Sequence, residues 1–155
     1  MSTEADPVLD ELSTLVFEMT RRLRNDFNVS AAELNLPPTQ ALALMCLVAP
    51  ASMRELATRL SCEPSNVTAI VDGLERRGLV TRELDPSDRR IKQVTLTGEG
   101  KRHRTKLGSH NKAKVAAVFN LSAPDRSQLR DLLSRALGDS SRSTSDSSES
   151  RPAPQ

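Results

Sequence analysis

Residues 52–78 decide the fold, and they read SMRELATRLSCEPSNVTAIVDGLERRG. Ser52 followed three residues later by Glu55 is the capping-box pattern that begins a helix. After the linker 61–63, Pro64 stands where the first residue of a second helix is expected, and Gly78 can end that helix in a left-handed conformation. The stretch therefore predicts two short helices, 52–60 and 64–77, joined by a tight turn.

The spacing of apolar residues changes after Gly78. Alternation from Val80 to Leu84 and from Lys92 to Leu96 predicts two strands. A polar turn sequence, Asp85-Pro86-Ser87-Asp88-Arg89-Arg90, lies between them and carries two arginines. Two short helices followed by a hairpin with a cationic tip describe a winged helix-turn-helix.

Four more helices are expected around this unit. Apolar residues at steps of three and four predict a helix from Val8 to Phe27, capped by Asp6 and followed by a polar break over 28–35. A helix over 39–48 is apolar nearly all round, which favours burial. Helices over 98–119 and 122–137 follow the hairpin. The predicted fold class is mainly α with a small β-hairpin (α+β).

This order of elements predicts four regions. They are an N-terminal dimerisation helix (1–35), a winged helix-turn-helix domain (36–98), C-terminal dimerisation helices (99–137) and a disordered tail (138–155). The tail has seven serines in eighteen residues and no large apolar side chain, too little to offset the entropy of ordering. Dimerisation is expected because long apolar stripes on so small a chain need a second copy to cover them.

Charge and composition narrow the function. Residues 76–106 hold ten basic and four acidic side chains, a net charge of +6 that suits a polyanion. The chain has three Phe and no Trp or Tyr, which argues against a stacking platform for single-stranded nucleic acid. No apolar run reaches the ~20 residues of a membrane span, and no signal peptide is recognised, so we expect a cytoplasmic protein without a membrane partner.

The second short helix is the expected reader of double-stranded DNA. Its outward positions include small hydroxyl and amide side chains that can reach base edges or phosphates in a major groove, and arginines stand at its far end and on the wing. The wing arginines can enter the adjacent minor groove. The predicted DNA-binding residues are Arg54, Ser65, Asn66, Thr68, Arg76, Arg77, Asp88, Arg89 and Arg90.

Residues 52–60, 71–80, 85–90 and 94–100 resemble the DNA-binding core of the MarR family, and the wing sequence is the most specific part. The resemblance implies a homodimeric transcriptional regulator, expected to be a repressor, that binds a palindromic operator. It also implies that Asp88 orients arginines, that Arg89 or Arg90 enters the minor groove, and that a small anionic or phenolic effector binds between the dimerisation helices and the DNA-binding domain. The sequence identifies no residue of that effector site.

Two other functions stay open. Cys62 precedes the reading helix near Arg59 and could make the regulator redox-responsive, whereas Cys46 is expected to be a buried structural thiol. The basic face could instead serve a helical interaction module that binds a protein or RNA. An enzyme is not expected, because no nucleophile–base pair or Gly-rich phosphate loop is recognised. No cofactor or metal is expected either, and His103 and His110 are interpreted as solvated.

Overall fold

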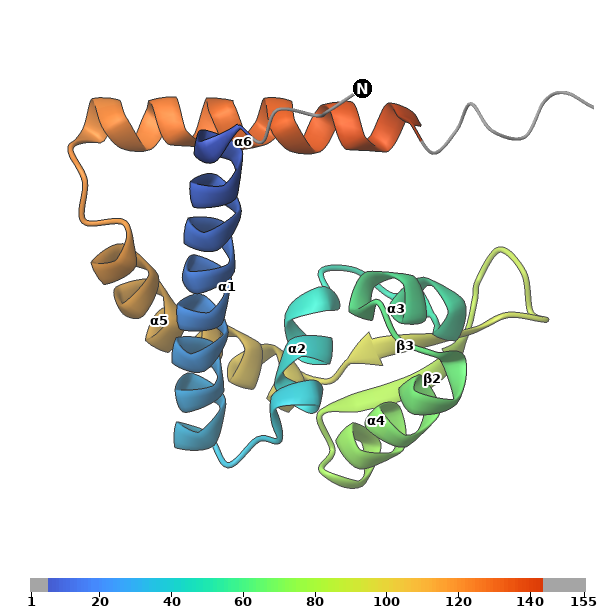
Figure 1. Ribbon diagram of the computed structural model, residues 1–155. Helices are drawn as coiled ribbons and strands as arrows, with labels where there is room; N and C mark the ends of the chain where they lie inside the picture. The colour runs from blue at the N-terminus through green and yellow to red at the C-terminus, as the bar shows by residue number, and fades with distance from the viewer. Residues whose placement is uncertain (1–5, 144–155) are drawn as a thin grey trace, which may run out of the picture. The chain divides into compact units, whose positions relative to one another are not determined.

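The computed structural model describes residues 6–143, with side chains up to 138. Its central part, which we call the head, spans residues 38–96 (Figure 1). The head contains α2 (Pro38–Cys46), β1 (Ala51–Ser52), α3 (Met53–Leu60), α4 (Pro64–Arg76), β2 (Val80–Leu84) and β3 (Lys92–Leu96). This is the predicted winged helix-turn-helix, with α3 and α4 as the helix pair and β2–β3 as the wing.

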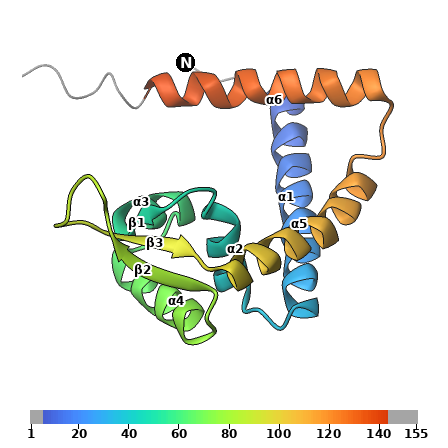
Figure 2. The same ribbon diagram turned by 180° about the vertical axis from the view of Figure 1, so that it is seen from behind.

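The sheet has three antiparallel strands in the order β1-β3-β2 (Figure 2). The two wing strands have the predicted bounds, and Val80 pairs with Leu96 and Leu84 with Lys92. The sequence did not predict β1, in which Ala51 pairs with Val94. Two residues are too few to show alternation, so this strand exists only because β3 offers it a free edge.

The core of the head forms where α2, α3 and α4 meet the sheet. Its fully buried large side chains are Leu44, Leu47, Leu56, Val67, Val71, Leu74 and Val94. Each such side chain stabilises the fold by roughly 1.5–3 kcal/mol. Gly73 of α4 lies against the side chain of Gln40 in α2, and an added Cβ would stand 2.3 Å from Nε2 at the far end of that side chain. The buried side chains thus pack α4 against α2 and α3.

Helix α1 (Pro7–Glu33) is longer than predicted. Asp6 caps it as expected, accepting a hydrogen bond from the Val8 amide at 3.0 Å. The predicted polar break over 28–35 is wrong, because the helix continues to Glu33 and the chain turns only at Asn35, with φ +53°. Ser30 and Ala31 are fully buried within the stretch that looked like a break. Tertiary burial therefore overrides the polar local sequence.

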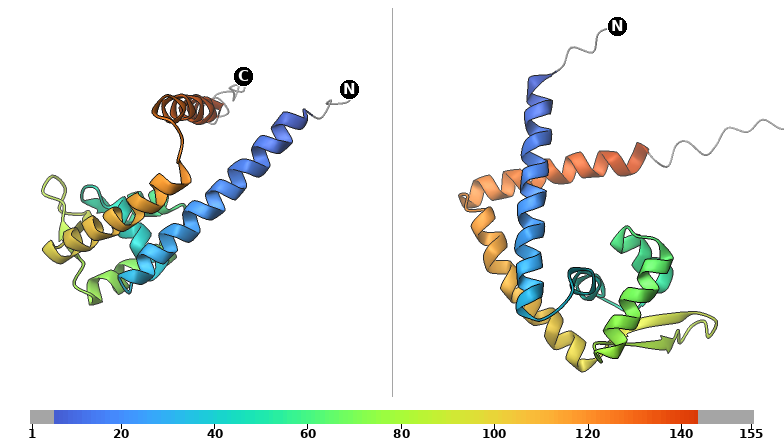
Figure 3. Two further views of the ribbon diagram at one scale, coloured as in Figure 1. Left: turned by 90° about the vertical axis from the view of Figure 1, so that its left-hand side faces the viewer. Right: turned by 60° about the horizontal axis from the view of Figure 1, so that its bottom comes forward.

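Helix α5 (Gly98–Val118) packs along the second half of α1 (Figure 3). Lys114 Nζ donates hydrogen bonds to Ser30 Oγ at 3.0 Å and to Glu33 Oε1 at 3.2 Å. Nδ1 of His110 lies 3.0 Å from the other oxygen of Glu33. The hydrogen bond from Lys114 holds the pKa of the Glu33 carboxyl below its ordinary value. This cluster ties the end of α1 to the middle of α5.

Within the described residues, 119–143 form a separate unit that contains α6 (Ala123–Ser143). Ser122 caps this helix by accepting a hydrogen bond from the Asp125 amide at 3.2 Å. The prediction that disorder begins at residue 138 is wrong for 138–143, which are helical. A single Gly138 costs a helix only about 1 kcal/mol and does not end it. The remainder of the predicted tail, 144–155, lies outside the described residues.

Helices α1 and α6 expose several large apolar side chains each. On α1 these are Val8, Leu9, Leu12, Leu15, Val16, Phe17 and Val29, and on α6 they are Leu132, Leu133 and Leu137. Leu12 and Val16 are each about half exposed, at 51% and 52%. Within residues 6–143, no helix is both long enough and apolar enough to span a membrane.

Candidate nucleic-acid interface

Helix α4 presents one apolar and one polar face. Val67, Val71 and Leu74 point into the core, and Pro64 occupies the first turn. Ser65, Asn66 and Thr68 are exposed on the other side, as predicted for a helix that reads a major groove. The N-cap is Glu63, whose side chain makes no capping hydrogen bond. Three of the predicted DNA-binding residues therefore share one accessible face near the helix N-terminus.

A groove of about 640 Å³ lies between α3 and the start of α4. Arg54, in the first turn of α3, lines it together with Thr58, Cys62, Glu63 and Asn66. The capping box fixes this end of α3, because Ser52 Oγ accepts from the Glu55 amide and Glu55 Oε2 accepts from the Ser52 amide at 2.7 Å. The structure thus brings Arg54 and Asn66 to one concave surface.

The two arginines at the end of α4 differ. Arg76 is exposed, as a phosphate contact requires. Arg77 Nη1 donates to the Asn35 carbonyl at 2.9 Å, so its guanidinium links the end of α4 to the turn between α1 and α2. Arg77 therefore helps to hold these two segments together. A contact between Arg77 and a phosphate stays a prediction.

Aspartates organise the wing loop. Asp85 accepts hydrogen bonds from the Ser87 amide at 2.8 Å and from Gln93 Nε2 at 2.7 Å. Asp88 accepts from the Arg90 amide at 3.0 Å and so holds the backbone of the tip. The structure records no bond from Asp88 to a guanidinium within residues 6–143, so its role in orienting arginine side chains stays a prediction. Arg89 and Arg90 are exposed at the tip.

Arg82, for which no role was predicted, lies on β2 and faces α4. Its Nη2 lies 2.5 Å from Asp72 Oδ1, and its Nη1 is paired with Glu75 Oε2. Asp72 is only partly exposed and pairs with Arg82. The strand alternation could have indicated this position, because it places Arg82 on the same inward side of β2 as Val80.

The end of α2 receives two guanidinium groups from neighbouring helices. Arg59 Nη1 donates to the Cys46 carbonyl at 3.0 Å, and Arg104 Nη1 donates to the Leu47 carbonyl at 3.2 Å. These cations satisfy carbonyls at a helix C-terminus that has no basic residue of its own in the last turn.

Cys46 was expected to be buried, but its side chain is only half-buried. Burial raises the pKa of the Cys46 thiol and outweighs the opposite effect of the nearby Arg59 charge. Cys62 is half-buried and packs against the core.

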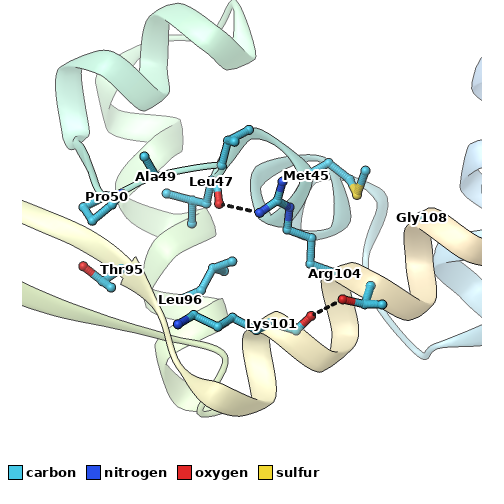
Figure 4. Close-up of a pocket in the computed structure, with 11 residues that line it drawn as sticks. Met45, Leu47, Ala49, Pro50, Thr95, Leu96, Lys101, Arg104 and Gly108 are labelled. Atoms are coloured by element: carbon cyan, nitrogen blue, oxygen red, sulfur yellow. Dashed lines mark hydrogen bonds between the residues drawn. The ribbon is translucent and has the colours of Figure 1, made fainter.

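A cavity of about 680 Å³ lies where α2, β3 and α5 meet (Figure 4). Its wall is apolar at Met45, Leu47 and Leu96, and Lys101 and Arg104 supply positive charge. None of these wall residues was identified from the sequence, because they come from separate elements of the chain.

The histidines are not simply solvated. His103 Nδ1 lies 3.1 Å from Glu99 Oε1, and His110 pairs with Glu33 as described above. The Glu99–His103 spacing of four residues could have been read from the sequence. In the described part of the chain, no group of three or more His, Cys, Asp or Glu side chains is placed to hold a metal ion.

Comparison with known proteins now identifies the fold. The MarR family model matches residues 36–92, which cover the head up to the start of β3. The head is a MarR-family domain. The solved structure of CouR from Rhodococcus jostii RHA1 bound to p-coumaroyl-CoA is similar to this one. That structure superposes with a TM-score of 0.72 at 28% identity, covering 84% of this chain and 94% of CouR.

Curated relatives agree. The uncharacterised HTH-type transcriptional regulator YkoM of Bacillus subtilis is 33% identical over 102 residues, which cover 64% of this chain and 66% of YkoM. The HTH-type transcriptional repressor MdtR of the same species is 28% identical over 98 residues, covering 62% of this chain and 63% of MdtR. The chain therefore matches slightly less than two thirds of each relative's length. Both proteins are named as regulators and not as enzymes, in agreement with the sequence analysis.

Proposed function

We propose that this chain is a MarR-family transcriptional regulator that binds a palindromic double-stranded operator as a homodimer and acts as a repressor in the cytoplasm. The observation that carries the proposal is the polar, exposed face of α4 beside a wing with two unobstructed arginines. The helix can lie in the major groove and the wing arginines in the adjacent minor groove.

Dimerisation follows from the apolar stripe of α1. Two α1 helices that cover each other would remove the exposed Leu12 and Val16 side chains from water. Two-fold symmetry would then place two α4 helices about 34 Å apart, one turn of DNA, which is the spacing of a palindromic operator.

Selection of bound duplexes from random DNA tests this function. The expected result is a symmetric consensus. Arg89→Ala with Arg90→Ala should lower the affinity for that duplex by roughly 1–3 kcal/mol per lost groove contact and flatten the salt dependence. Glu83→Ala, on the same hairpin, is the matched control and should not weaken binding. An unchanged affinity of the double variant would contradict the assigned role of the wing.

An effector site is supported by the cavity between α2, β3 and α5. Lys101 and Arg104 suit an anion, and the apolar wall suits an aromatic ring. A bound carboxylate would compete with the Leu47 carbonyl for Arg104 and so loosen the contact between α2 and α5. CouR, whose structure contains p-coumaroyl-CoA, supports an acidic phenolic compound or its thioester as effector.

The effector proposal is tested by adding p-coumaroyl-CoA or salicylate to the operator complex. Release of the wild-type protein, with release by the Arg104→Gln variant requiring a higher concentration, is the expected result. If neither compound binds the free protein in calorimetry, this effector class is wrong. An oxidant tests the redox alternative. If that alternative holds, the oxidant should release the wild-type protein from the operator but not the Cys62→Ser variant.

A further inference from the structure

Arg82 occupies a special place on the wing. The inward side chains of β2 become more exposed from the base of the wing to its tip, with Val80 buried, Arg82 intermediate and Leu84 exposed. On β3, Val94 is buried opposite Arg82, and Lys92 beyond it is exposed. Apolar packing of the hairpin onto the head therefore ends at the level of Arg82, and the tip with Arg89 and Arg90 projects beyond it.

The guanidinium of Arg82 makes a forked contact with α4. One nitrogen binds Asp72 and the other binds Glu75, and the Arg82 side chain is 24% exposed. The hydrogen bond to Asp72 contributes most to raising the pKa of Arg82, so the group is charged at every pH of interest. Two carboxylates held by one planar fork restrain the angle between strand and helix more than a single point charge could.

The same contact changes the charge of α4. Asp72 and Glu75 are 43% and 41% exposed, on a helix that our proposed function brings close to phosphates. Left alone, these carboxylates would repel the DNA backbone, and Arg82 offsets one of the two negative charges. Arg76, which borders the same small depression, stays available to a phosphate.

We propose that Arg82 is a positioning residue for DNA binding: its fork holds the wing and the reading helix at a fixed mutual orientation and masks the carboxylates of Asp72 and Glu75. Arg82 acts through these two side chains and does not itself contact DNA. The inference rests on the proposed function, because it assumes that α4 and the wing engage the same duplex.

A double-mutant cycle tests this role. Arg82→Gln in the wild-type chain should reduce affinity for the selected duplex about tenfold or more, because two carboxylates lose their charged partner. In an Asp72→Asn/Glu75→Gln background, the same change should reduce affinity by about threefold or less, since no charge remains to be masked. The salt slope should be the same with and without Arg82 in that background, whereas a lost phosphate contact would lower it by about one.

Arg76→Gln is the matched control. It removes an exposed cation one residue from Glu75, and its effect should be equal in the two backgrounds. Thermal unfolding of each variant shows whether the fold is kept. If Arg82→Gln does not fold, Arg82→Lys, which keeps the charge but reaches one carboxylate at a time, should bind with intermediate affinity and show the same dependence on background.

The outcomes separate the two proposals. Equal losses for Arg82→Gln in both backgrounds, with a lower salt slope, would mean that Arg82 contacts DNA directly and would overturn the positioning role alone. If the wild type selects no duplex, the DNA-binding function is overturned and the role of Arg82 with it.

Discussion

The head and helix α1 solve the problem of burying apolar surface in opposite ways. The head covers Leu44, Leu56 and Leu74 completely with its own helices and sheet. The first half of α1 leaves Leu12 and Val16 half exposed in the single chain. The difference teaches that the head carries its own apolar core, whereas the long helix would need the second copy of the proposed dimer to cover its apolar side chains. Substitutions in α1 and in the head should therefore have different effects.

The largest effect is expected for Leu12→Gln with Val16→Gln on α1. A dimer would lose four buried apolar side chains, each worth roughly 1.5–3 kcal/mol, and should dissociate. The thermal unfolding of the head should stay unchanged. Sedimentation gives the oligomeric state, and Arg21→Gln on the opposite side of α1 is the control. A dimer that survives the double change would show that another surface holds the copies together.

A smaller but still large effect is expected for Leu56→Ala inside the head. Leu56 is fully buried, so its truncation leaves a cavity and should destabilise the head by about 2–5 kcal/mol. Denaturant unfolding measures this loss. The dimer contact should persist below the unfolding transition. A loss under 1 kcal/mol would mean that the head collapses around the site.

A loss of about 1 kcal/mol is expected for Ser52→Ala, which removes half of the capping box of α3. Ser122→Ala at the start of α6 makes a comparison outside the head, since Ser122 also caps by accepting from a backbone amide. The head's unfolding midpoint should fall only for Ser52→Ala. Equal shifts in both variants would show that the two units unfold together.

The smallest effect concerns pH. The hydrogen bond from the Ser52 amide holds the pKa of the Glu55 carboxyl below its ordinary value of 4.5. The ionised carboxylate therefore stabilises the head above pH 4.5, and this contribution disappears as the pH falls through the lower pKa of the folded state. Glu55→Gln should be slightly less stable than the wild type at neutral pH, and the difference should shrink on acidification. A difference that is constant between pH 7 and pH 3 would contradict this role.

The local sequence was a good guide wherever a signal lies within a few residues. The Ser52–Glu55 capping box, Pro64 at the start of α4, Gly78 with its positive φ after α4, and the wing alternation all appear in the structure as predicted. Ser65, Asn66 and Thr68 were placed on the exposed face of α4 by helical periodicity alone.

Signals that depend on distant partners were missed. The polar stretch after Phe27 looked like a break, yet Lys114 of α5 and the burial of Ser30 keep it helical. Strand β1 needed the edge of β3, and the cavity needed three elements to form its wall. Such features are set by contacts between residues far apart in the chain, which no local pattern contains.

The sequence by itself determined a winged helix-turn-helix with a cationic tip, because capping, turn chemistry and periodicity act over one to four residues. Only the tertiary structure decided which arginine side chains bind acceptors within the protein and which remain exposed. Arg77 binds the Asn35 carbonyl, and Arg104 binds the Leu47 carbonyl. Arg82 binds the carboxylates of Asp72 and Glu75. Arg89 and Arg90 stay exposed. The physical reason is that an arginine reaches whatever acceptor packing brings near it, and packing is a property of the whole fold.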